Sequence, residues 1–100
     1  MIPLIIDRLL ASASSRIASL VHLHQQMNKI SKAGVIRKAQ NLPVLVGRHT
    51  KLIRELLGAQ YKSSRDVGLE WCSTDQRAGW LDRCDAYDAD AKAKEAELCG

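Results

Sequence analysis

Three histidines are the side chains of this chain best suited to acid–base or metal chemistry. His22 and His24 are two positions apart, so on a helix their side chains diverge by about 200° and cannot hold one metal ion together. His24 and His49 both fall on the apolar seams described below. This placement favours hydrogen-bonded histidines in a core or an interface over metal ligands or catalytic bases. If the two seams face each other, these two rings could meet and make the core sensitive to pH.

Cysteines and paired carboxylates are the next candidates for chemistry. The chain has three cysteines, Cys72, Cys84 and Cys99. A cysteine nucleophile needs a neighbouring base and a lowered pKa, and the local sequence supplies neither. Their odd number and the lack of C-x-x-C spacing indicate a reducing setting and no metal site. Asp82, Asp85 and Asp88 recur every three residues, which predicts one exposed, solvated side of a helix rather than a buried acid–base pair.

Motifs of enzymatic function are missing from the sequence. It contains no glycine-rich phosphate loop, no nucleophile elbow and no metallohydrolase helix motif. We therefore predict that the protein is not an enzyme and that it has no catalytic residue, no metal and no cofactor.

Basic side chains between positions 29 and 65 are the strongest surface signal. Residues 1–65 hold eleven Lys or Arg and two acids, whereas residues 66–100 hold four Lys or Arg and nine acids. The basic segment could bind phosphates or an acidic protein. It could also be a solvated face, or be neutralised by the acidic half of the same fold. We predict five partner-binding residues, Arg37, Lys38, Arg48, Lys51 and Arg54.

Helices are the elements predicted to position these side chains. At alternating spacings of four and three, the chain places Ile6, Leu10, Ala13, Ile17, Leu20, His24 and Met27. This seam predicts a helix over about residues 3–32, with Pro3 in its first turn and Gly34 as its C-terminal cap. A seam of about six turns exceeds what a small bundle covers, so part of it could form a homodimer or partner interface.

Pro43 predicts a break, with Asn41 as the cap of a second helix that begins there. Its predicted seam is Leu42, Leu45, His49, Leu52 and Leu56, widened by Val46, Ile53 and Leu57. A turn or kink near Ser63 and Ser64 and a continuation through Trp71 both remain open.

The last helix is predicted from a capping box. Ser73 precedes Gln76 by three positions, as the reciprocal cap of a helix start requires. The predicted inner face that follows is Trp80, Cys84, Tyr87, Ala91 and Leu98. No sustained period-two alternation occurs, so the expected fold is all-α, a small bundle of three to four helices in a single domain over residues 1–100.

Export and membrane insertion are not expected. The first thirteen residues superficially resemble a signal sequence, but Asp7 and Arg8 interrupt the apolar run and no basic segment precedes it. No stretch approaches the roughly 18 apolar residues that a membrane span needs. We predict a cytoplasmic protein without a membrane partner.

In its size, its helical pattern and its lack of catalytic motifs, the chain resembles small proteins that phages and prophages encode to disable host machinery. It is similar in particular to anti-CRISPR proteins directed at type I, including type I-F, surveillance complexes. The resemblance implies a stoichiometric inhibitor in the host cell cytoplasm that blocks target-DNA binding, duplex opening or nuclease recruitment. Many such inhibitors are acidic DNA mimics, whereas the first two-thirds of this chain is basic. Only the acidic last helix is therefore a candidate for mimicry.

A small basic helical DNA- or RNA-binding regulatory module is the alternative prediction. It is weakened because no aromatic residue lies among the basic side chains of residues 29–54, and because no clear helix-turn-helix pattern occurs.

Overall fold

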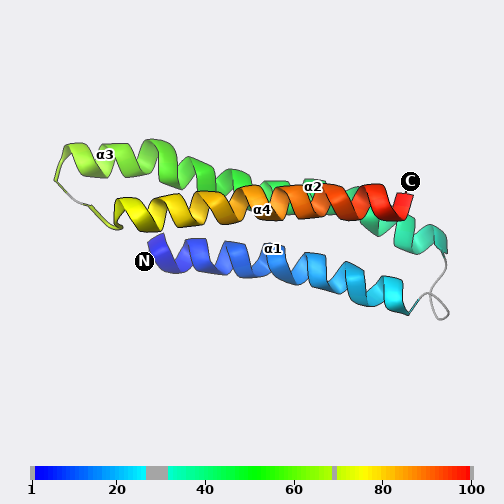
Figure 1. The fold of residues 1–100 in the computed structure, drawn as a ribbon. Coiled ribbons are helices and arrows are strands. Elements are labelled where there is room, and N and C mark those ends of the chain that lie inside the picture. The colour runs from blue at the N-terminus through cyan, green and yellow to red at the C-terminus, as the bar shows by residue number, and fades with distance from the viewer. Residues whose placement is uncertain (1, 27–31, 69, 100) are drawn as a thin grey trace.

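Three long helical rods lie side by side along one axis (Figure 1). The computed structural model describes residues 2–26, 32–68 and 70–99, and the protein measures 56 × 21 × 17 Å. Helix α1 is Ile2–Gln25, and α2 is Lys32–Glu55, which continues through the π-helical segment η1 (Leu56–Gln60) into α3 (Tyr61–Asp66). The last rod is α4, Thr74–Cys99. The described ranges contain no strand, which confirms the predicted all-α bundle, and no helix long and apolar enough to cross a membrane.

Helix α1 buries the predicted seam but ends earlier than predicted. Its buried residues are Ile6, Leu10, Ala13, Ile17 and Leu20. The helix stops at Gln25, and the next residue, Gln26, still donates its N–H to the His22 carbonyl at 3.2 Å. The predicted end near residue 32 and the Gly34 cap were wrong, because both positions lie in the first turn of α2. Met27, also assigned to the seam, lies outside the described residues.

Helix α2 runs without a break through Pro43, so the predicted break was wrong. A proline inside a helix removes one N–H donor and costs about 3 kcal/mol. A fully buried Val, Leu or Ile side chain contributes roughly 1.5–3 kcal/mol, and several along one side of α2 outweigh that cost. The buried row is Val35, Ala39, Leu42, Val46, Thr50 and Ile53. Asn41, predicted as a cap, is an exposed residue in mid-helix.

The buried side of α2 is rotated away from part of the predicted seam. Leu42, Val46, Ile53 and Leu57 are buried as predicted. In contrast, Leu52 is 49% exposed, and Leu45, His49 and Leu56 are only half-buried. The apolar stripe of α2 is therefore broader than α1 and α4 can cover, and its uncovered edge faces α1.

The chain leaves α3 at Val67 and Gly68, so neither open alternative holds: the helix continues past Ser63 and Ser64 to Asp66 but does not reach Trp71. Gly68 has a φ of 79°, in the left-handed region that glycine adopts without strain, and its N–H donates to the Arg65 carbonyl at 2.9 Å. The predicted capping box then starts α4. Gln76 N–H donates to Ser73 Oγ, and Ser73 N–H donates to Gln76 Oε1, both at 3.0 Å.

Two apolar clusters form the core, and a polar contact separates them. The first cluster is Ile6, Leu10, Ile53, Leu57, Tyr61, Cys72, Trp80 and Cys84. The second is Ala13, Ile17, Leu20, Ala39, Leu42, Val46 and Ala91. The predicted inner face of α4 is confirmed, because Tyr87 and Leu98 pack against these clusters beside its buried residues. Fully buried Thr50 belongs to neither cluster.

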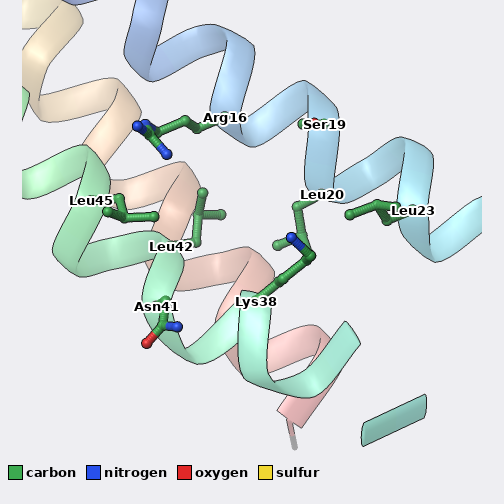
Figure 2. Close-up of a pocket in the computed structure, with 8 residues that line it drawn as sticks. All are labelled: Arg16, Ser19, Leu20, Leu23, Lys38, Asn41, Leu42 and Leu45. Atoms are coloured by element: carbon green, nitrogen blue, oxygen red, sulfur yellow. The ribbon is translucent and has the colours of Figure 1, made fainter. Parts of the chain in front are cut away.

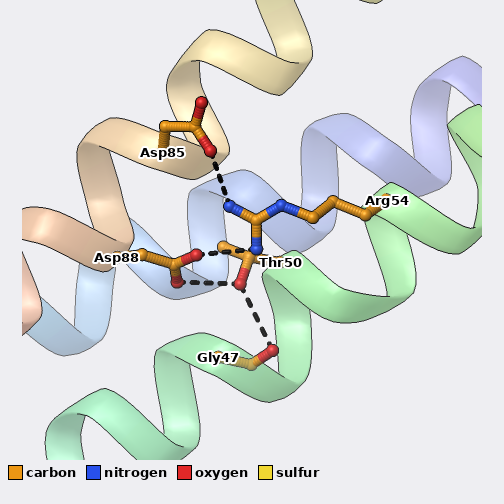
Figure 3. Close-up of polar contacts among 5 residues, drawn as sticks. All are labelled: Gly47, Thr50, Arg54, Asp85 and Asp88. Carbon is orange, nitrogen blue, oxygen red and sulfur yellow. Dashed lines mark hydrogen bonds and ion pairs between the residues drawn. The ribbon is translucent and has the colours of Figure 1, made fainter.

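Thr50, Arg54 and Asp88 form this contact, the polar layer (Figure 3). Thr50 Oγ1 lies 2.8 Å from Asp88 Oδ1 and 3.2 Å from the Gly47 carbonyl, and its single proton goes to the nearer, charged acceptor. Arg54 places one nitrogen 2.7 Å from Asp88 Oδ2 and the other 2.8 Å from Asp85 Oδ1. Asp88 is 25% exposed and Asp85 74%. The prediction of a wholly solvated acidic side was therefore wrong for Asp88.

Two further hydrogen bonds fix α4 near its start. Trp80 Nε1 donates to Asp7 of α1 at 3.2 Å. Arg77 Nε donates to the Leu57 carbonyl at 2.7 Å, in the π-helical segment where the regular helical hydrogen-bond pattern is interrupted. These contacts join α4 to both other rods at the same end of the molecule.

Replacing Pro43 by Ala is expected to raise the free energy of unfolding by about 1–3 kcal/mol, because it restores an N–H donor in mid-helix. Chemical denaturation measures this difference. The control is Gln40→Ala on the exposed side of the same helix, which should change stability by less than about 0.5 kcal/mol. Equal stability of Pro43→Ala and the wild type would contradict a continuous α2.

Removing the Asp88 carboxylate with Asp88→Ala is expected to cost about 1–3 kcal/mol, because it removes the nearer acceptor of the buried Thr50 hydroxyl and the less exposed partner of the Arg54 guanidinium. The matched change Asp85→Ala removes an exposed partner of the same guanidinium and should cost less than about 1 kcal/mol. Urea denaturation of both variants tests this. Equal losses would show that the polar layer does not stabilise the contact between α2 and α4.

Candidate partner-binding surface

Three of the five predicted partner-binding residues lie together on the outer side of α2. At about 100° per residue, Arg37, Arg48 and Lys51 fall within about 60° of one another, opposite the buried row. All three are exposed. Among the ion pairs of the described residues, none involves these three side chains. We call this surface the basic face.

The other two predicted residues lie on opposite flanks of α2, about 100° to either side of Arg37. Lys38 faces α1 and lines a groove with Arg16 (Figure 2). Arg54 faces α4 and belongs to the polar layer, where hydrogen bonding to Asp85 is the main cause that raises the pKa of its guanidinium. The structure thus groups three of the predicted residues, assigns Lys38 to a groove and engages Arg54 within the chain.

A groove between α1 and α2 opens beside the basic face. Its apolar end has a volume of about 380 Å³ and is lined by Ile5, Leu9, Leu52, Glu55, Leu56 and Ala59. Ile5 and Leu52 are 48% and 49% exposed, one on each wall. Exposed aliphatic side chains that face each other across a groove are typical of a surface that another macromolecule covers.

The other end of the groove is smaller and carries charge. This basic end has a volume of about 220 Å³ and is lined by Arg16, Ser19, Leu20, Leu23, Lys38, Asn41, Leu42 and Leu45. In Figure 2 the Arg16 side chain extends from α1 toward Leu45, and Lys38 extends from α2 toward Leu20. Leucine side chains form the base of this end of the groove, and Arg16 and Lys38 lie on its two sides.

Between the two ends, Ser12 of α1 and His49 of α2 span the groove, with 3.4 Å between Ser12 Oγ and His49 Nε2. Burial, followed by the charge of Arg16, lowers the pKa of His49, so its ring is neutral at neutral pH. The two histidines of the predicted seams do not meet. His24 lies twelve residues beyond Ser12 on α1, roughly 18 Å away, and lines a separate pocket between α1 and α4.

Nucleophilic and metal chemistry have little support in the described part of the chain. Burial raises the pKa of Cys72 and of Cys84, which keeps both thiols protonated and poorly nucleophilic. Cys99 is exposed, and its thiol lies 3.7 Å from the Ile36 carbonyl. Across residues 2–26, 32–68 and 70–99, no three His, Cys, Asp or Glu side chains are grouped to hold a metal ion.

The groove is the feature that the sequence did not predict. Leu45, His49, Leu52 and Leu56 were assigned to a buried seam, whereas they form one wall of the groove. The signal in the sequence was the width of the apolar stripe on α2, which exceeds what one helical neighbour on each side can bury. Comparison with known proteins adds no relative, because no protein-family model, no curated protein and no solved structure matches this chain.

Acidification is expected to destabilise the fold through His49. Its folded pKa lies below the ordinary value of 6.5, so the unfolded chain takes up the proton first. The contribution of His49 to the free energy of unfolding is fully present above about pH 6.5. It is lost as the pH falls toward the lower pKa of the folded state. Thermal unfolding between pH 8 and pH 5 measures this effect.

The variant His49→Gln keeps a polar side chain at this position and removes the titration, so it should lose part of the decline in stability on acidification. The control His22→Gln changes an exposed ring on α1 and should retain the decline of the wild type. Parallel pH profiles for His49→Gln and the wild type would contradict the assignment.

Proposed function

We propose that this protein is a non-enzymatic inhibitor that binds stoichiometrically to a host complex that handles nucleic acid. The preferred target is a type I CRISPR surveillance complex. The observation that carries the proposal is the basic face beside the α1–α2 groove, where three exposed cations and an uncovered apolar surface lie on one rigid helix.

Rigidity is what makes this surface suited to binding. The polar layer holds α2 against α4, and α1 covers the buried seam, so the backbone under the basic face is fixed. Arg37 and Lys51 are fourteen residues apart, roughly 21 Å along the helix. Cations held on a fixed scaffold lose little conformational entropy when they bind, and arginine pairs with carboxylates or phosphates through two parallel hydrogen bonds.

Steric occlusion is a better supported mode of inhibition than mimicry of DNA. Two carboxylates of the acidic last helix, Asp85 and Asp88, share the guanidinium of Arg54, which offsets one of their two negative charges. On the outer side of α2, the exposed Arg37, Arg48 and Lys51 outnumber the exposed Glu55, and this net positive charge suits an acidic protein surface or a bound nucleic acid. The proposed protein is encoded by a phage or prophage and acts in the host cytoplasm, where it blocks target-DNA binding, duplex opening or nuclease recruitment.

Direct binding of DNA or RNA is the second candidate function, and the same line of cations on the basic face favours it. It predicts binding to duplex or single-stranded DNA that weakens steeply as salt rises. The apolar groove beside the cations is less suited to a phosphate backbone than to a protein.

Reversing the charge of the basic face with Arg37→Glu, Arg48→Glu and Lys51→Glu is expected to weaken inhibition at least about tenfold, because attraction to the target becomes repulsion. The assay titrates the protein against a type I surveillance complex and follows target-DNA binding and cleavage. The control combines Arg8→Glu, Lys62→Glu and Lys92→Glu, which makes the same change in net charge at exposed positions on other helices. Circular dichroism should show unchanged helicity in both variants.

Two results would contradict the proposal. Undiminished DNA binding and cleavage, without co-elution at a several-fold excess of the wild-type protein, would remove the tested complex as the target. Binding to a free DNA duplex that the basic-face variant loses, with no effect on the complex, would support the second candidate instead.

A further inference from the structure

We infer that the α1–α2 groove is covered by a second copy of this chain, packed antiparallel about a twofold axis through the level of Ser12 and His49. This interface adjoins the basic face, because Glu55 of the groove lies one turn beyond Lys51 on the same side of α2. The homodimer that the long first seam suggested cannot use the seam from Ile6 to Leu20, because the seam residues there are buried in the monomer. The flank of α1 that lines the groove takes its place.

The order of side chains along the groove is self-complementary. Ile5, Leu9, Leu52 and Leu56 line one end, and Leu20, Leu23 and Leu45 line the other. Ser12 and His49 separate the two ends. The centre of the apolar end lies about six residues, roughly 9 Å, from this polar pair, and the centre of the basic end lies between seven and eight residues, roughly 11 Å, from it. A twofold axis at the polar pair therefore places the apolar end of one copy on the leucines of the other.

The charges of the groove are complementary in the same arrangement. Glu55 is the one acidic side chain among the described residues that line either end, and it lies at the apolar end. Arg16 and Lys38 lie at the basic end. Rotation about the axis brings Glu55 of one copy to a level between Arg16 and Lys38 of the other, about 3 Å from Arg16 and about 7.5 Å from Lys38 along the helices. A parallel pairing would place like charges together instead.

Burial of apolar surface favours this occupant. Ile5 and Leu52 are 48% and 49% exposed in the monomer, and in the pair each covers leucines of the other copy. The neutral ring of His49 adds no cation at the axis. Two basic faces then lie side by side and run in opposite directions, so that the inhibitor is bivalent; this last step alone rests on the proposed function.

Sedimentation equilibrium of the purified protein at 1–100 µM tests the pairing without any target. We expect a reversible dimer with a dissociation constant in the micromolar range. Ile5→Ser and Leu52→Ser should each raise that constant at least about tenfold. Leu4→Ser is the matched control, because Leu4 neighbours Ile5, is also 48% exposed and does not line the groove. It should change the constant less than about twofold, with unchanged helicity in every variant.

A charge swap tests the register without altering the apolar surface. Lys38→Glu and Glu55→Lys should each weaken the dimer at least about fivefold, and the double variant should bind itself more tightly than either single variant. A monomer up to 100 µM would overturn the inference, as would equal weakening by Leu4→Ser and Ile5→Ser. Additive weakening by the two charge changes would also overturn it. A dimer that forms as expected while the surveillance complex is not inhibited would remove the proposed target alone.

Discussion

The Asp88 carboxylate contacts the Thr50 hydroxyl and the Arg54 guanidinium together, and this double contact fixes how α4 packs on α2, since the Thr50 hydroxyl alone could donate to the Gly47 carbonyl of its own helix. Asp88 is the acceptor, and a carboxylate in a half-buried position needs a cation, which Arg54 supplies one turn from Thr50. A shift of α4 by one residue would break both contacts. The apolar clusters on either side of the polar layer would tolerate sliding more easily, because aliphatic contacts are not directional. The polar layer therefore sets the register, and the clusters provide most of the burial.

That register determines which surfaces of α2 stay open. Helix α4 packs against the side of α2 that carries Thr50 and Arg54, and α1 packs against the other side, so the outer edge with Leu45, His49 and Leu52 is only partly covered by α1. A bundle of three rods has only these two neighbours to offer. The same arrangement leaves the basic face opposite the buried row. The groove and the basic face are thus adjacent for one reason, namely how many sides of α2 the chain can cover.

The periodicity of apolar residues in the sequence predicted the helices and their buried faces well. It predicted less well where the first two helices begin and end. The seam of α1, the inner face of α4 and its capping box follow from local spacing, because each depends on residues within a few turns. The continuity of α2 through Pro43 could not be predicted locally, since it depends on burial supplied by α1 and α4. The same holds for Arg54 and Asp88, which look like exposed charges in the sequence and meet only after α2 and α4 pair at a separation of 34 residues. The width of the stripe on α2 was visible, but not which edge would be left uncovered.

Internal pairing also changes how the charge of the chain should be interpreted. The acidic last third of the sequence suggests a dipolar molecule, yet Arg54 occupies two of its carboxylates, and Lys94 pairs with Glu97 within α4. The cations of the basic face have no such partners among the described residues. The basic face is therefore a group of exposed cations that can attract an approaching acidic surface. Because the adjacent groove has an acidic side chain at one end and basic side chains at the other, its charges complement those of a second copy that packs antiparallel on it.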